Sequence, residues 1–89
     1  MARLVYTEGF VDDVARVELP GKRDEIFRYA VMLADFPEAG SPVVAASVAD
    51  RFGNGVRKLA VRPFLVVYEY RKAEDAVYFL GLVHQKRAR

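Results

Sequence analysis

The chain has 89 residues, a formal net charge of +2, no cysteine and one histidine. This length leaves room for one hydrophobic core, so we expect a single domain over residues 1–89. The absence of cysteine excludes disulfides and thiolate chemistry, and together with the single histidine it argues against a closed zinc site.

The apolar content of 53% is typical of a folded globule rather than a disordered tail. No stretch approaches the ~20 apolar residues of a membrane span, and the N-terminus does not read as a signal peptide. We therefore expect a cytoplasmic protein without a membrane partner.

Charge is divided unevenly between the two halves of the sequence. Residues 1–50 carry five Arg or Lys and nine Asp or Glu, whereas residues 51–89 carry nine Arg or Lys and three Asp or Glu. An asymmetry of this size predicts two faces with different partners, the basic face meeting an anionic one. An ordinary solvated surface is the alternative interpretation.

The first half predicts a strand followed by two helices. Residues 3–6 are apolar and favour a strand, and Thr7 is placed to cap a helix in which Phe10, Val14 and Val17 share one face. Pro20 and Gly21 end this helix. A second apolar stripe predicts a helix over residues 22–36, antiparallel to the first in a helix hairpin.

The second half predicts a β-meander. Residues 41–54 are open to two readings, an extended loop or a short helical turn. Period-two patterns then predict strands over residues 56–61, 64–71 and 76–83, and their short connections make the meander antiparallel. We expect an α+β fold in which the opening strand joins one edge of the sheet and the helix pair covers one face.

Basic residues on the first meander strand are candidates for contacting the target. Alternation along this strand turns Lys58 away from Leu59 and Val61, onto what we expect to be the open face of the sheet. Arg57 then lies at the core edge, where it has to extend past apolar atoms or pair with an acid. Arg62 follows in the tight turn. Tyr68, which could stack on a base, fits core packing better.

Residues 84–89, His-Gln-Lys-Arg-Ala-Arg, follow the last predicted strand directly. Cationic side chains at a strand end can reach phosphates, which makes Lys86, Arg87 and Arg89 candidates for binding an anionic target. His84 is the natural acid–base candidate, because histidine exchanges protons most readily near neutral pH. A solubilising tail and a structural histidine are the alternatives.

No motif for nucleotide-dependent or metal-dependent chemistry is present in the sequence. The acids of the two predicted helices are best explained as solvated faces: Asp12, Asp13, Asp24 and Glu25. We expect no cofactor and no metal.

Four segments in this order resemble the RelE/ParE superfamily, the toxins of bacterial type II toxin–antitoxin modules that are also called plasmid-stabilisation proteins. They are Phe-Pro-Glu-Ala-Gly-Ser-Pro at 36–42, Gly-Val-Arg-Lys-Leu at 55–59, Pro-Phe-Leu-Val-Val-Tyr at 63–68, and Val-Tyr at 77–78 leading to Val-His-Gln-Lys-Arg at 83–87. The resemblance covers essentially the whole chain.

This resemblance implies growth arrest by the free toxin, neutralisation by a cognate antitoxin lying across the sheet or the helix hairpin, and a hetero-oligomer of the two. Members similar to RelE cleave mRNA on the ribosome without a metal, which assigns catalysis to Lys58, His84 and Arg87. Members similar to ParE are thought to inhibit DNA gyrase without chemistry of their own. Arg57, Arg62, Lys86 and Arg89 would then contact the target.

Two departures favour the ParE-like activity. The family usually has arginine where Leu65 stands, and no C-terminal tyrosine follows the last strand. The ending from His84 to Arg87 is closer to the ending common in ParE-like members. A non-catalytic nucleic-acid-binding module is a further alternative, since it requires only the basic half.

Overall fold

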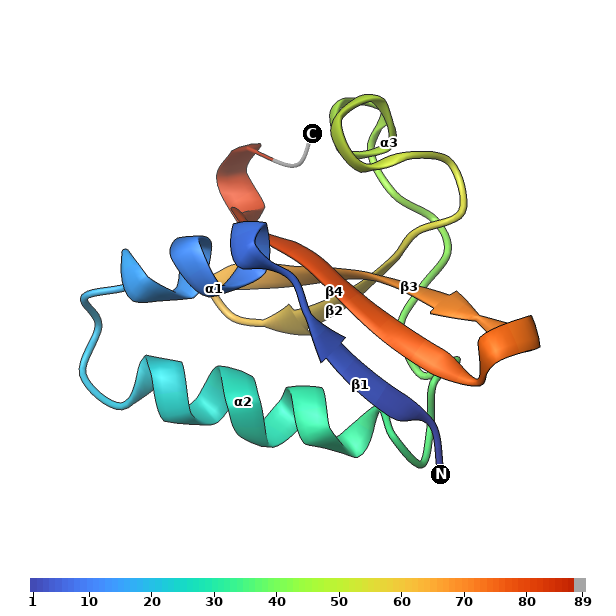
Figure 1. The fold of residues 1–89 in the computed structure, drawn as a ribbon. Coiled ribbons are helices and arrows are strands. Elements are labelled where there is room, and N and C mark those ends of the chain that lie inside the picture. The colour runs from blue at the N-terminus through green and yellow to red at the C-terminus, as the bar shows by residue number, and fades with distance from the viewer. Residues whose placement is uncertain (88–89) are drawn as a thin grey trace.

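The computed structural model describes residues 1–87 and has an α+β fold (Figure 1). The elements in chain order are β1 (Arg3–Tyr6), α1 (Glu8–Ala15), α2 (Lys22–Met32), α3 (Ala46–Phe52), β2 (Arg57–Val61), β3 (Phe64–Arg71) and β4 (Ala76–His84). Two single turns of 3-10 helix complete it, η1 (Lys72–Glu74) in the last hairpin and η2 (Gln85–Arg87) after β4.

The four strands form one mixed sheet in the order β1-β4-β3-β2. Strands β2, β3 and β4 are antiparallel, as predicted, and β1 occupies one edge, also as predicted. However, β1 runs parallel to β4, so the sheet is not a purely antiparallel meander. Pairing the first strand with the last is compatible with a parallel arrangement because long crossover segments separate the two.

Helix α1 begins where Thr7 caps it. The Thr7 hydroxyl accepts from the Phe10 N–H at 3.4 Å and donates to the Phe79 carbonyl of β4 at 2.6 Å. One side chain thus satisfies a free N–H of the helix start and ties the helix to the sheet. The cap predicted from sequence is confirmed.

Helix α2 is shorter than predicted, ending at Met32 rather than Phe36. Residues 33–35 form turns, and the Ala34 carbonyl accepts the Ala2 N–H at 2.7 Å, in front of β1. Pro37 disfavours helical backbone at the residue before it, so the helix stops short of the proline. The apolar pattern in the sequence extends beyond Met32 because Leu33 and Ala34, which follow the helix, are also buried in the core.

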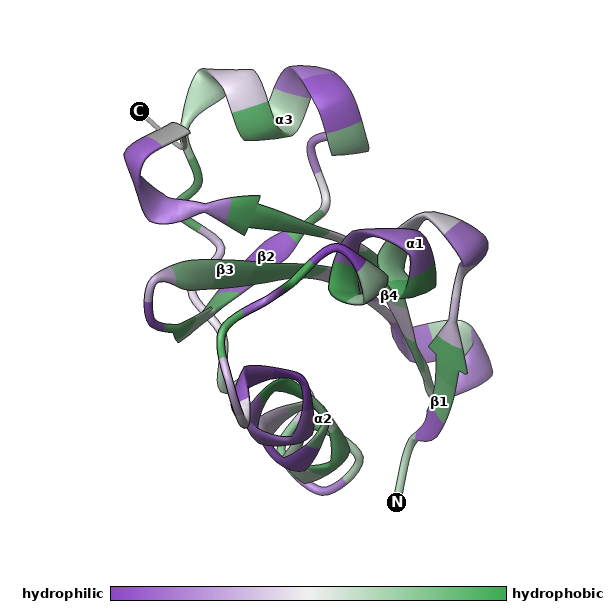
Figure 2. Cartoon of the chain, turned by 90° about the vertical axis from the view of Figure 1, so that its left-hand side faces the viewer, coloured by the Kyte–Doolittle hydropathy of each residue, from purple (hydrophilic) through white to green (hydrophobic). Residues whose placement is uncertain are grey.

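The segment left open by the sequence contains a helix, α3, which lies across the sheet from α2 (Figure 2). Val48 and Phe52 of α3 pack with Val56, Val67 and other apolar side chains in a second, smaller core. The sheet face predicted to be open is therefore partly covered. Burial of Val48 and partial burial of Val44, Ala45 and Phe52 against the sheet explain this coverage.

The main core lies between the sheet and helices α1 and α2. Its largest fully buried side chains come from all of these elements: Phe10, Ile26, Leu33, Val66, Tyr68, Val77 and Phe79. Within residues 1–87, no helix has the length and apolar character that crossing a membrane requires.

Candidate functional site

The segment at residues 36–42 is anchored by a buried tyrosine of the central strand β3. The Tyr68 hydroxyl donates to the Pro37 carbonyl at 2.9 Å and accepts from the Gly40 N–H at 2.8 Å. A Cβ on Gly40 would lie 2.5 Å from that hydroxyl, so only glycine fits there. Burial raises the pKa of Tyr68, although the hydrogen bond from Gly40 and the charge of Arg57 act in the opposite direction. The core assignment of Tyr68 is confirmed.

Arg57 holds the same segment from the neighbouring strand. Its guanidinium donates to the Gly40 carbonyl at 2.8 Å and the Glu38 carbonyl at 3.2 Å, and it lies 3.7 Å from the Glu38 carboxylate. Arg57 thus pairs with an acid at the edge of the core, as the strand alternation predicted. These donors are used within the chain, and its role in target binding stays a prediction.

Lys58 projects from the face of β2 that α3 partly covers. It lies opposite Val67 of the smaller core, and its backbone N–H and C=O each bond to Ser41 at 2.9 Å. Among the residues that the structure describes, no carboxylate forms an ion pair with its ammonium group. Its charge is therefore available to a partner.

His84 is the last residue of β4 and lies on the other face of the sheet. It is paired with Phe64, which packs against the main core, and the two rings meet edge to face at 5.7 Å. Its Nδ1 accepts the Lys86 N–H at 3.2 Å. Nδ1 therefore serves as the acceptor, and a neutral imidazole in this contact has its N–H at Nε2. The strand register therefore places His84 and Lys58 on opposite faces of the sheet.

The remaining candidates lie at the ends of strands. Arg62 is exposed in the β2–β3 turn, where its carbonyl accepts from the Lys22 ammonium at 2.6 Å. Lys86 is exposed in η2, and the backbone of Arg87 ends the same turn. The side chain of Arg87 and the whole of Arg89 lie outside the described part of the structure.

Asp13 is a site residue that sequence reasoning missed, because it was assigned to a solvated helix face. Its side chain is only 14% exposed, and its Oδ2 accepts the Leu82 N–H of β4 at 2.9 Å. Two arginines face it, Arg16 at 3.3 Å and Arg51 of α3 at 3.8 Å. Asp13 therefore joins α1, the free edge of β4 and α3. The helical period alone carried no signal for this contact.

A cleft opens beside Asp13, between α3 and the end of β4. We call it the α3–β4 cleft. It has a volume of about 200 Å³ and is lined by Ser47, Val48, Arg51, Phe52, Leu82, Val83 and His84. A Cβ on Gly81 would lie 2.6 Å from two atoms of the Phe52 ring, so glycine permits α3 to approach the sheet this closely.

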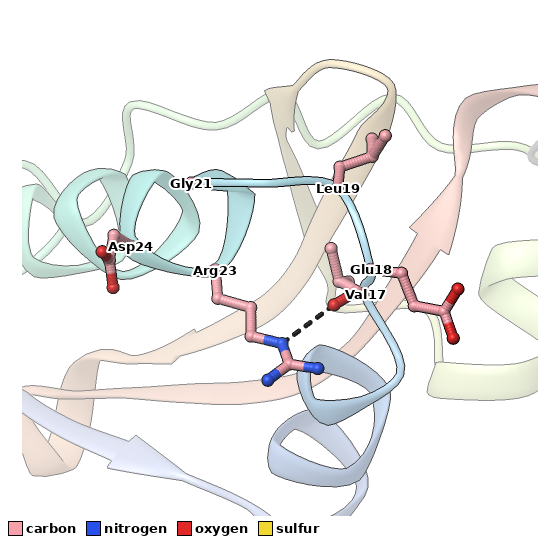
Figure 3. A pocket seen from close by; sticks show the side chains of 6 residues that line it. All are labelled: Val17, Glu18, Leu19, Gly21, Arg23 and Asp24. Atoms are coloured by element: carbon pink, nitrogen blue, oxygen red, sulfur yellow. Dashed lines mark hydrogen bonds between the residues drawn. The ribbon is translucent and has the colours of Figure 1, made fainter.

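A larger and more open hollow of about 500 Å³ lies at the α1–α2 connection, lined by residues that include Val17, Leu19 and Arg23 (Figure 3). Arg23 donates to the Val17 carbonyl at 2.9 Å and to the Ala15 carbonyl at 2.6 Å. The arginine thereby satisfies carbonyls at the end of α1. The hollow therefore results from the way in which the connection joins α1 to α2.

The outer side of α2 and the turns that follow it carry exposed apolar side chains. Tyr29, Met32 and Phe36 are 43%, 37% and 62% exposed and line two adjoining shallow hollows with Glu25 and Glu38. We call these three residues the outer stripe of α2. Apolar stripes rimmed by charge are typical of protein-binding surfaces.

No group of three or more His, Asp or Glu side chains within residues 1–87 is placed to hold a metal ion.

Known structures share this fold. A chain of a RelBE toxin–antitoxin complex from Mycobacterium tuberculosis superposes with a TM-score of 0.75 at 16% identity, covering 93% of this chain and 96% of that one. The isolated RelE toxin of E. coli gives 0.70 at 15% identity, covering 94% and 84%. The intact E. coli RelBE complex gives 0.69 at 13% identity, covering 94% and 96%.

A search of curated proteins found no match to the sequence. Residues 4–89 match the family model described as the ParE toxin of the type II toxin–antitoxin system parDE. That match spans nearly the whole chain, and the similar structures have the α+β fold that the four sequence segments led us to expect. The chain belongs to the ParE toxin family of type II toxin–antitoxin systems.

Proposed function

We propose that this toxin arrests growth in the cytoplasm by inhibiting DNA gyrase, as a binding protein without chemistry of its own. The observation that carries the proposal is the separation of Lys58 and His84 on opposite faces of the sheet. A metal-free nuclease needs its cations and its acid–base group around one scissile phosphate.

Leu65 supports the same interpretation. It stands where the family usually has arginine, and here it is only 6% exposed on the face that α3 partly covers. A buried leucine contributes no charge to a phosphorane. The match to the ParE family model adds to this support.

The test is a supercoiling reaction with purified gyrase, relaxed plasmid and the full-length toxin. We expect loss of supercoiling and accumulation of gyrase–DNA complexes that yield linear DNA after detergent and protease. Unimpaired supercoiling over a range of toxin concentrations that arrests growth would remove the proposal.

Ribosome-dependent mRNA cleavage is the second candidate, favoured by the similarity to the RelE fold at TM-scores of 0.70 and 0.75. Lys58 and Arg87 would then stabilise the phosphorane while His84 exchanges protons. Mapping of mRNA ends in a translating extract distinguishes the two functions. Codon-phased cuts that vanish in Lys58→Ala and in His84→Ala would establish the enzyme.

We also propose a cognate antitoxin as the partner of this chain, forming a hetero-oligomer with it. The outer stripe of α2 supports this proposal because it leaves three large apolar side chains in water beside the carboxylates of Glu25 and Glu38. A segment with apolar residues at helical spacing would complement it. Co-expression with the product of the adjacent gene tests the pair: Phe36→Ser should weaken rescue of growth, whereas Val43→Ser, exposed elsewhere, should not.

A further inference from the structure

The outer edge of β1 presents backbone groups without partners. The Arg3 N–H donates to the Asp75 carbonyl at 2.8 Å, and the Thr7 N–H donates to β4 at 3.2 Å, so both residues bond toward β4. Because alternate residues of a strand direct their backbone groups to opposite sides, Leu4 and Tyr6 turn their N–H and C=O groups away from β4. Within residues 1–87, nothing bonds to these groups of Leu4 and Tyr6.

The sheet protects its other open edges more fully. Beyond the part of β4 that β1 covers, the Asp13 carboxylate accepts a backbone N–H of β4 at 2.9 Å. On β2, Ser41 exchanges two backbone hydrogen bonds of 2.9 Å with Lys58 inside the strand. Blocking contacts and lysines of this kind commonly prevent unwanted pairing at strand edges. On β1 the comparable contact lies ahead of the strand, where the Ala2 N–H donates to the Ala34 carbonyl at 2.7 Å.

An apolar hollow adjoins this edge on the side of α2. The Tyr6 ring is 37% exposed and meets the Phe27 ring of α2 edge to face at 5.5 Å. Phe27 and Val31, one turn apart on α2, line a hollow of about 460 Å³ together with Asp24 and Arg28. Val31 is 56% exposed. Apolar side chains that arrive along the edge of β1 therefore have apolar surface to cover.

The unpaired groups select an extended partner segment. A helix uses its own backbone groups internally, whereas an added strand presents a row of N–H and C=O groups that can pair with those of Leu4 and Tyr6. Side chains of such a strand alternate between the two faces of the sheet, so every second one would face α2.

We propose that an extended segment of the cognate antitoxin pairs with Leu4 and Tyr6 and adds a fifth strand to the sheet. Alternate side chains of this segment are apolar and pack on Tyr6, Phe27 and Val31. The pairing rests on the proposed antitoxin partnership, which the membership of the ParE toxin family supports. It is separate from the outer stripe of α2, because the helical period places that stripe on another side of the helix from Phe27 and Val31.

Hydrogen exchange at single amides of the full-length toxin, followed by NMR with and without the product of the adjacent gene, tests the pairing. In the free toxin, we expect the Leu4 and Tyr6 amides to exchange faster than the Val5 amide, which bonds toward β4. In the complex, Leu4 and Tyr6 should slow by at least about 10-fold. The amide of Ala60, which is exposed on the opposite edge strand, is the control and should keep its rate.

Substitution in the hollow tests the side-chain contact. We expect Val31→Ser to raise the Kd of the complex about 3- to 10-fold, because a valine that the antitoxin segment covers is replaced by a polar residue. Val43→Ser is the matched control, since Val43 is 75% exposed on the segment before α3. Circular dichroism establishes that both variants fold. Equal affinities of the two variants contradict the proposal.

The outcomes distinguish the strand pairing from the antitoxin partnership. If no complex forms with the adjacent gene product, both are removed. A complex in which Leu4 and Tyr6 exchange as in the free toxin, or in which Ala60 slows equally, removes only the strand pairing. Slowing of the Leu4 and Tyr6 amides in the toxin alone, as its concentration rises, would assign the edge to a second copy of the chain and overturn the proposed occupant.

Discussion

Lys58 and His84 lie on opposite faces of the four-stranded sheet, although they occupy neighbouring parts of a small domain. The register pairs Lys58 with Val67, which α3 covers, and His84 with Phe64, which packs against the main core. A shift of one residue in the strand register moves a side chain to the other face of the sheet, so the register decides which side chains can meet. The consequence is that Lys58 and His84 cannot meet on one face of the sheet.

The contact between Phe52 and Gly81 predicts a strict size limit at position 81. Gly81→Ala places a Cβ 2.6 Å from the Phe52 ring, so α3 has to move away from the sheet. We expect a loss of about 1–3 kcal/mol in the free energy of unfolding, measured by urea denaturation. Gly55→Ala is the control, because its Cβ would lie 3.4 Å from the nearest atom, the end of the Glu69 side chain. Equal stability of the two variants would contradict the packing described.

We expect removal of the Tyr68 hydroxyl to lower the free energy of unfolding while the packing of the aromatic ring is kept. Tyr68→Phe leaves the Gly40 N–H and the Pro37 carbonyl without their buried partner, which costs about 1–3 kcal/mol. Tyr29→Phe, at an exposed tyrosine, should change the free energy of unfolding by less than about 0.5 kcal/mol. Similar small effects for both variants would remove the role given to this hydroxyl.

The same tyrosine predicts sensitivity to alkaline pH. Burial raises the pKa of Tyr68 in the folded state above its value of about 10 in the unfolded chain. The neutral phenol is thus favoured by folding, and its contribution is fully present below pH 10 and is lost as the pH rises above 10. The free energy of unfolding, measured between about pH 8 and about pH 11, should decline less with pH for Tyr68→Phe than for the unaltered chain. Parallel declines would contradict this.

Asp13 predicts a graded response to substitution. Asp13→Asn keeps an oxygen for the Leu82 N–H but loses the charge that faces Arg16 and Arg51. Asp13→Ala loses both and should cost about 1–3 kcal/mol, more than the asparagine variant.

The exposed neighbour Asp12 provides the matched control for this series. Asp12→Ala should lie within about 0.5 kcal/mol of the unaltered chain. Hydrogen exchange at the Leu82 amide should accelerate in Asp13→Ala only. Unchanged exchange there would show that the carboxylate does not protect this strand edge.

Much of the fold could be predicted because its signals are local. The Thr7 cap, the period-two strands and their short turns depend on residues close in sequence. The parallel pairing of β1 with β4 could not be predicted, because it joins segments about seventy residues apart. Helix α3 was left open since a short apolar run fits either a loop or a helix until its packing surface is known.

The candidate site was predicted less completely, for related reasons. Alternation correctly turned Arg57 toward an acid, but the irregularity between Val67 and Tyr68 shifts the register of β4 and with it the face of His84. Asp13 and Arg51 carry no sequence pattern of their own. Their roles arise from three elements meeting at one strand edge.

Gyrase cleavage complexes test the proposed inhibition of gyrase by this toxin most directly. Full-length toxin is mixed with gyrase and plasmid, and linear DNA is measured after detergent and protease, while mRNA ends are mapped in parallel in a translating extract. We expect linear DNA that increases with toxin concentration, and unchanged mRNA ends. Codon-phased mRNA cuts with no trapped gyrase complexes would contradict it.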